Sequence, residues 1–188
     1  MSLNRLFRLS SFVILFGLFT LLQTPHLEAG GWGKTDDVLE HEKMLWNGVF
    51  FDMNGLHFAA FLPNYTGGSL ENGWVYLRGQ ADKDVNYSIS TTFNKGYNPP
   101  NSPPKSLDEF LFNLESHNPD CIVIPVDTKR LGKVKYAADL IPKNPNSGRP
   151  WDRYCWRFIC TGDRVIRMGT DDANHNRQLY FFDSIYIY

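Results

Sequence analysis

Two carboxylates and an imidazole come close together in the sequence at Asp171, Asp172 and His175. A carboxylate that orients a histidine can make a general base, and neighbouring carboxylates also suit a divalent cation. A stretch rich in Asp, Asn and Gly is, however, typical of a solvent-exposed loop, where these side chains bond to nearby backbone groups. We treat Asp171, Asp172 and His175 as an alternative polar site rather than as the first choice.

The thiols are the second group of residues with possible chemistry. Cys155 or Cys160, combined with His175 and Asp172, would supply the nucleophile, base and orienting acid of a small hydrolase, although no local motif supports that combination. Cys155 and Cys160 lie five apart in a predicted strand, so their side chains should point to opposite faces. We therefore predict a disulfide of Cys121 with Cys155 or Cys160, and three reduced, buried thiols are the alternative.

Metal and cofactor motifs are absent from the sequence. The histidines have no H-x-H or H-x-x-x-H spacing, and there is no Cys-x-x-Cys pair on which a zinc site could form. The glycine pairs at 30–31 and 67–68 lack the strand-to-helix context of a phosphate loop. We predict no metal site and no cofactor.

Aromatic and arginine side chains gather most densely at Trp151, Arg153, Trp156 and Arg157. Trp, Tyr and Arg dominate binding hot spots, and aromatic rings also stack on sugars. These four residues are therefore the predicted binding cluster. The alternative is that Trp156 belongs to the core and that the arginines are ordinary charges on a strand face.

The beginning of the chain predicts export. Arg5 and Arg8 precede an uncharged apolar run over 12–22, which is too short to cross a membrane, and a small residue follows at Ala29. Residues 1–29 therefore resemble a signal peptide, and the mature protein should be periplasmic or extracellular, without stable membrane insertion. The formal net charge of −1 gives no reason to expect a nucleic-acid partner.

Local patterns then predict the elements that position these residues. Residues 30–44 are polar, Gly-rich and acidic, which indicates a flexible N-terminal arm before a single domain over 45–188. Asn54-Gly55 between apolar runs predicts a two-residue hairpin turn, which sets Phe51 opposite Phe58 and Asp52 beside His57.

The remaining segments alternate as strands, apart from one helix. Ser106 and Glu109 predict a capping box for an amphipathic helix that ends near His117. Strands are predicted over 71–79, 85–93, 121–126, 133–141, 151–160 and 164–168, with a final strand, or a short helix plus strand, over 179–188. The predicted fold class is α+β: a mostly antiparallel β-sheet with an N-terminal hairpin and one main amphipathic helix packed on it.

The order of these elements resembles the PsbP-like superfamily. The similarity covers 45–188 and rests on Phe61-Leu62-Pro63 after the hairpin, Gly73-Trp74, the helix start SLDEF and the terminal FFDSIYIY. This resemblance implies an α/β/α sandwich and a binding or accessory role. It transfers no catalytic residue.

Three functions follow as hypotheses. The favoured one is an exported, non-catalytic domain that binds a protein partner or a small ligand. The first alternative is a small exported hydrolase that uses a Cys/His/Asp or an Asp/His site, which requires a cleft that collects His175 with its partners. The second alternative is a carbohydrate-binding module, which requires a row of aromatic rings on one face.

Overall fold

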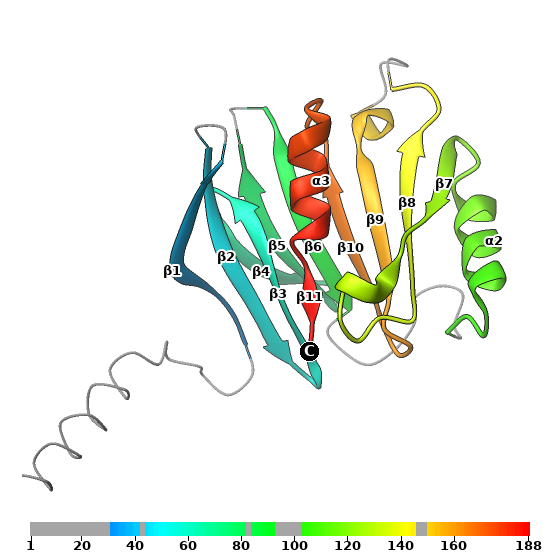
Figure 1. The fold of residues 1–188 in the computed structure, drawn as a ribbon, viewed down its shortest axis with the longest axis horizontal. Helices are drawn as coiled ribbons and strands as arrows, with labels where there is room; N and C mark the ends of the chain where they lie inside the picture. The colour runs from blue at the N-terminus through cyan, green and yellow to red at the C-terminus, as the bar shows by residue number, and fades with distance from the viewer. Residues whose placement is uncertain (1–30, 42–43, 82–83, 93–102, 146–149) are drawn as a thin grey trace, which may run out of the picture. The chain divides into compact units, whose positions relative to one another are not determined.

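The computed structural model describes residues 31–41, 44–81, 84–92, 103–145 and 150–188. The side chains of 31–45, 150 and 151 are outside this description, as is the predicted signal peptide over 1–29. Residues Trp32–Tyr188 form one compact unit. Within the described ranges, the fold contains two β-sheets and two α-helices (Figure 1).

Sheet A carries the hairpin, and sheet B is the larger sheet. Sheet A has the order β1-β2-β3-β11, with bounds Gly31–His41, Met44–Met53, Leu56–Pro63 and Tyr186–Ile187. Sheet B has the order β4-β5-β6-β10-β9-β8-β7, and its paired strands are antiparallel. Its bounds are Gly67–Glu71, Trp74–Gln80, Asn86–Thr92, Val165–Thr170, Cys155–Cys160, Tyr136–Pro142 and Cys121–Pro125. The predicted α+β class with mostly antiparallel strands is confirmed.

The hairpin has the register that the Asn-Gly turn predicts. Phe51 lies opposite Phe58, and Met53 lies opposite Leu56. Both turn residues have positive φ, 51° at Asn54 and 76° at Gly55, which is what a tight two-residue hairpin turn requires. On the polar side, Oδ1 of Asp52 lies 2.8 Å from Nδ1 of His57.

The N-terminal segment differs from its prediction. Residues Gly31–His41 form β1, which pairs with β2 at the edge of sheet A, so the expected flexible arm over 30–44 is wrong for this stretch. The reason is tertiary. Pairing with β2 supplies backbone hydrogen bonds, so this polar segment forms a strand although its sequence lacks the alternation of apolar and polar residues that would predict one.

A second Asn-Gly turn divides the strand that was predicted over 71–79. Asn72 and Gly73 have φ of 51° and 77°, and they join β4 to β5. Two other segments are also corrected. Residues Pro150–Arg153 form a 3-10 turn, η2, before β9. The end of the chain forms α3 (His175–Asp183) before β11. This agrees with the predicted alternative of a short helix plus a strand, but the helix begins before residue 179.

The main helix, α2 (Leu107–His117), has the predicted N-cap. The Ser106 side chain accepts a hydrogen bond from the Glu109 backbone N–H at 3.1 Å, while the Glu109 carboxylate accepts from the Lys105 N–H at 2.7 Å. Phe110 and Leu114 are buried and pack with Ala138, Leu140 and Cys160 of sheet B. The amphipathic face therefore covers the β7–β9 end of that sheet.

The main core lies between the two sheets. Side chains from β2 and β3 pack with those from β5, β6 and β10, and α3 adds Phe181 and Phe182. Figure 1 shows α3 and β11 in line, in front of β6 and β10. Sheet B therefore has an inner face toward sheet A and α3, and an outer face on the side of α2.

Candidate binding face and the buried Asp172 network

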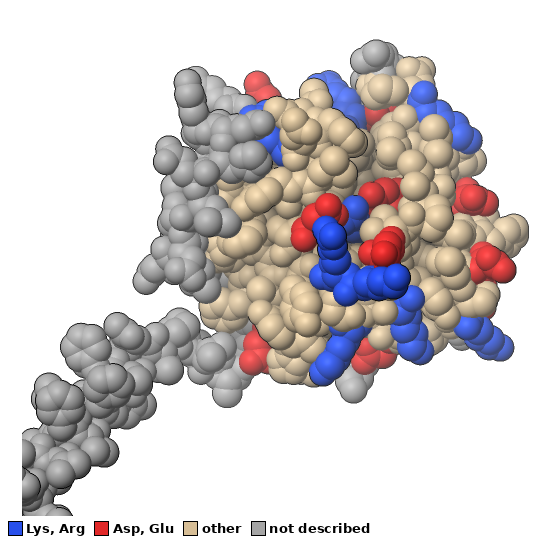
Figure 2. Space-filling model, viewed as in Figure 1, with Lys and Arg blue, Asp and Glu red and all other residues tan. Residues whose placement is uncertain are grey.

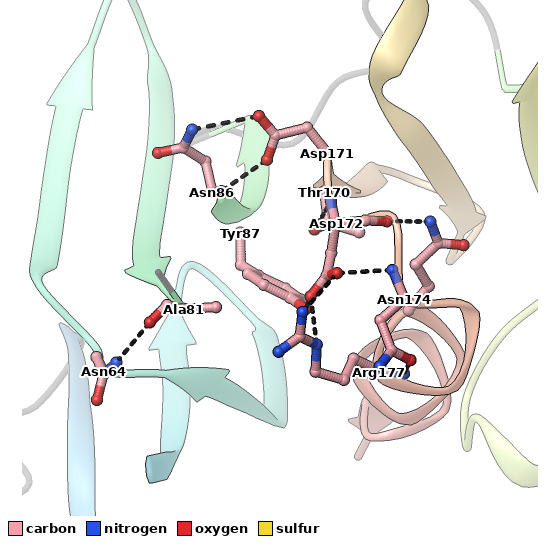
Figure 3. A network of polar contacts seen from close by, with 10 residues as sticks. Asn64, Ala81, Asn86, Tyr87, Thr170, Asp171, Asp172, Asn174 and Arg177 are labelled. Atoms are coloured by element: carbon pink, nitrogen blue, oxygen red, sulfur yellow. Dashed lines mark hydrogen bonds and ion pairs between the residues drawn. The ribbon is translucent and has the colours of Figure 1, made fainter. Parts of the chain in front are cut away.

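Asp172 is the centre of a buried polar network at the start of α3 (Figure 3). Its side chain is 2% exposed. The Tyr87 hydroxyl donates a hydrogen bond to Oδ2, which lies 2.7 Å from Nε of Arg177 in an ion pair. Oδ1 accepts from Nη2 of Arg177 at 2.9 Å and from the Asn174 backbone N–H at 2.8 Å. Both carboxylate oxygens are thus bound by groups of the protein itself.

This network connects secondary-structure elements of the protein and is not arranged to bind a substrate. Burial, followed by the hydrogen bond to Asp172, raises the pKa of Tyr87 well above its usual range, so this hydroxyl stays a neutral donor. Asn174 caps α3 by accepting from the Arg177 backbone N–H at 3.2 Å. Asp172 therefore connects β6 to the first turn of α3.

The other two members of the predicted polar site lie apart from Asp172. Asp171 accepts a hydrogen bond of 2.6 Å from the Asn86 backbone N–H and joins the end of β10 to the start of β6. His175 is exposed at the first residue of α3. In the part of the chain that the structure describes, no contact joins His175 to either aspartate, and no group of three or more His, Cys, Asp or Glu side chains could hold a metal ion.

All three cysteines are free, so the predicted disulfide is wrong. Cys121 lies opposite Pro142 at one end of β8, and Cys160 lies opposite Tyr136 at the other end. A separation of six residues along a strand is roughly 20 Å, far beyond the reach of a disulfide. Cys121 packs with the core under α2, whereas Cys155 packs with the main core on the other side of the sheet.

Burial raises the pKa of all three thiols, so none has the lowered pKa that activates a cysteine nucleophile. Cys155 and Cys160 do face opposite sides of β9, as their spacing predicts.

The predicted Trp and Arg cluster is divided between the two faces of sheet B. Arg157 is on the inner face and only 3% exposed. Its Nε lies 2.7 Å from Oδ1 of Asp139 and its Nη1 lies 2.6 Å from Oδ1 of Asp183. Burial alone would lower the pKa of Arg157, but the two carboxylates raise it. Arg157 is therefore a structural cation that joins α3 to β8.

The rest of that cluster does not meet at one point either. Arg153 is exposed in η2, and the Trp151 side chain lies outside the described residues. Trp156 points to the outer face of sheet B, opposite to its neighbour Arg157, because side chains alternate along a strand. Acidic and basic side chains gather beside α3 on the side of the molecule that Figure 2 shows, which is the side of Arg157.

Trp156 instead shares a face of sheet B with residues from strands that are far apart in the sequence. Directly opposed residues of antiparallel strands share a face. Two rows of directly opposed residues cross β9, β10, β6 and β5 in that order. The first row is Trp156, Gly169, Ser88 and Arg78, and the second row is Phe158, Arg167, Ser90 and Tyr76. We call this outer surface of β5, β6, β10 and β9, together with the residue before β9, the aromatic face. Its large side chains are Trp74, Tyr76, Arg78, Tyr154, Trp156, Phe158 and Arg167.

The rings of the aromatic face are half-buried, and they contact one another, the backbone of β10 and an arginine side chain. Tyr154 and Trp156 stack at 5.5 Å with 24° between their planes. A Cβ at Gly169 would lie 2.4 Å from Cζ3 of Trp156, so the six-membered ring occupies the space above that glycine. Arg167 places its guanidinium carbon 3.8 Å from the centroid of the Trp74 ring, a cation–π arrangement.

Small hydroxyl side chains lie between these rings. The alternation of β6 predicts that Ser88, Ser90 and Thr92 point away from the core, and they lie on the aromatic face. Ser90 is nevertheless only 4% exposed, because the face is crowded by larger neighbours. The face thus combines half-buried aromatic rings with the half-buried Ser88 and Thr92.

A shallow groove lies beside α3. It has a volume of about 550 Å³ and is lined by Phe61, Asn176, Leu179, Tyr180, Asp183 and Ser184. The Ser184 hydroxyl already donates to the Phe181 carbonyl at 2.7 Å and accepts from the Phe61 N–H at 3.0 Å. The Ser184 hydroxyl is therefore already engaged by the protein itself.

Comparison with known proteins adds no family. No family model, curated protein or solved structure matches this chain. The resemblance to the PsbP-like superfamily therefore stays a prediction. Among the described residues, no helix is both long enough and apolar enough to cross a membrane.

Proposed function

We propose that the chain is an exported, non-catalytic domain that binds a carbohydrate on its aromatic face. The observation that carries this proposal is the gathering of Trp74, Tyr76 and Trp156 on one face of sheet B, although they come from β5 and β9. Sugar rings present apolar C–H surfaces that stack on aromatic side chains, and their hydroxyls bond to polar groups between the rings. Export rests on the signal-peptide pattern of residues 1–29.

The polar clusters support the non-catalytic part of the proposal. A hydrolase needs a nucleophile or base that is free to reach a substrate. The Asp172 carboxylate is buried and bound by Tyr87, Arg177 and Asn174. The three thiols have raised pKa values, and His175 stands apart from the aspartates.

A protein partner is the second candidate, and a different surface favours it. Ile122, Ile124 and Ile141 are 50%, 43% and 37% exposed. Ile122 and Ile141 are directly opposed on β7 and β8, so the isoleucines share one face. Exposed aliphatic side chains in contact with one another are typical of protein contacts. This surface is on the opposite side of sheet B from the aromatic face.

A glycan-binding assay tests the first candidate. Immobilised neutral and acidic oligosaccharides are incubated with the mature protein, and the solution is analysed for cleaved sugar. We expect at least one saccharide to be bound without cleavage, and we expect Trp156→Ala to reduce binding at least tenfold. Phe112→Ala is the matched control, because Phe112 is an aromatic residue that is 68% exposed on α2 and outside the aromatic face.

Thermal unfolding confirms that each variant is folded, and Tyr76→Ala provides a second variant on the face. Binding that is unchanged in both variants, an absence of saccharide binding by the parent protein, or cleavage of the bound saccharide would contradict the proposal.

A further inference from the structure

We propose that the carbohydrate bound on the aromatic face carries a carboxylate, as uronic acids do, and that Arg167 binds this group. This inference rests on the proposed function and assigns the ligand class and the residue that determines specificity. It starts from the position of Arg167 on β10, opposite Ser90 on one side and Phe158 on the other.

The charge of Arg167 is not neutralised by any contact among the described residues. Its guanidinium stacks on Trp74, and its Nε is buried without a hydrogen-bond partner. Burial lowers the pKa of Arg167, while the Tyr76 hydroxyl opposes that shift through a hydrogen bond; no carboxylate contributes. A partly buried cation without a counter-ion is costly, and an anionic ligand would remove that cost.

Three other arginines of the fold show the usual arrangement. Arg78 is 3.0 Å from Glu71, and Arg157 and Arg177 pair with Asp139 and Asp172. Arg164 is also without an ion pair, but it is fully buried and donates to the backbone carbonyls of Met53 and Asn54. Arg167 therefore differs from these in being a partly accessible cation without an ion pair among the described residues, whereas Glu71, which lies opposite Trp74 on the same face, is paired with Arg78.

The chemistry around Arg167 suits an acidic sugar. A guanidinium presents parallel N–H donors that match a carboxylate. A uronic acid has its carboxylate on the pyranose ring, so one sugar residue can offer an apolar surface to the aromatic face and an acid group to Arg167. Nucleic acid also combines rings with negative charge, but the chain has a formal net charge of −1 and no basic stripe in its sequence.

A calorimetric titration with matched ligands tests this inference. The probes are oligosaccharides of galacturonate and of hyaluronan, each with free carboxylates and as the methyl ester, because the ester keeps the stacking surface and removes the charge. We expect the parent protein to bind one of the free acids at least tenfold more tightly than its ester. That preference should weaken as salt is added.

Variants assign the preference to Arg167. Arg167→Gln should bind the acid and the ester equally, and Arg167→Lys should retain part of the preference because it keeps the charge without the planar donors. Arg130→Gln is the control, because Arg130 is exposed in the 3-10 turn η1 (Thr128–Arg130), outside the aromatic face. Circular dichroism checks that each variant is folded.

The outcomes separate the two proposals. Equal affinity of the parent protein for acid and ester, or an undiminished preference in Arg167→Gln, would overturn the inference. Binding of neutral oligosaccharides that is lost in Trp156→Ala would then leave the proposed function standing. If no saccharide binds, both proposals fail, and tighter binding of a single-stranded oligonucleotide than of any saccharide would also overturn the inference.

Discussion

The six-membered ring of Trp156 lies over Gly169 on the neighbouring strand, in the space that any other side chain at position 169 would fill. This relationship connects two strands of the aromatic face, because a side chain of β9 occupies the space beside a residue of β10. It explains why a glycine, which weakens a strand, stands within β10, next to its last residue.

Gly169→Ala should therefore damage the aromatic face. The added Cβ would lie 2.4 Å from Cζ3 of Trp156, so the ring must turn away. We expect a loss of stability of about 1–3 kcal/mol, typical of an overpacked site, together with weaker saccharide binding. Urea unfolding and the glycan assay measure the two effects; Gly68→Ala on β4 is the control. Wild-type binding in folded Gly169→Ala would show that the ring position is not required.

Asp172→Asn should destabilise the fold strongly. The amide has nearly the shape of the carboxylate but removes the negative charge that lies 2.7 Å from Nε of Arg177. Removing one partner of a buried ion pair typically costs about 3–5 kcal/mol. Asp171→Asn is the matched control and should cost about 1 kcal/mol or less, since one amide oxygen can still accept from the Asn86 N–H. Equal losses in chemical denaturation would contradict a central role for Asp172.

Tyr87 predicts a stability change in alkaline solution. Its pKa is raised in the folded state by burial and by Asp172, so above the ordinary tyrosine pKa of about 10 the unfolded chain loses this proton more readily. The contribution of Tyr87 to stability is complete below that pH and decreases as the pH rises above it. Denaturation between about pH 9 and 11 should show a shallower decrease for Tyr87→Phe than for the parent protein. Identical slopes would mean that Tyr87 ionises equally in both states.

Export should remove the N-terminal segment. The charged start, the short apolar run and Ala29 predict a mature chain that begins at or near Gly30. Mass spectrometry of the exported product measures that N-terminus. An intact segment 1–29 on a protein that stays embedded in the membrane would refute the signal-peptide assignment.

The sequence predicts those parts of the fold that depend on local signals. Asn54-Gly55 gives the hairpin and its register, and Ser106 with Glu109 gives the start of α2. The pairing of β1 with β2 was missed, because the composition of 31–41 resembles a loop and only tertiary pairing makes it a strand. The cysteines are free because the order of the strands in sheet B keeps them apart. The spacing of Cys121, Cys155 and Cys160 along the sequence does not reveal that order.

The candidate site was predicted only at Trp156. Trp74 and Arg167 are far apart in sequence, and they meet because β5, β6 and β10 are neighbours in sheet B. No local pattern contains that order. One error could have been avoided: the two-residue period of a strand already places Trp156 and Arg157 on opposite faces.

Nuclear magnetic resonance gives the most direct test of the central claim that a carbohydrate binds the aromatic face. The ¹⁵N-labelled mature protein is titrated with the oligosaccharide that binds best in the glycan assay, and backbone shifts are mapped. We expect the largest changes at 74–78, 88–92, 154–158 and 165–169. Changes concentrated instead in the groove around Tyr180 and Asp183, or around Ile122 and Ile124, would contradict it.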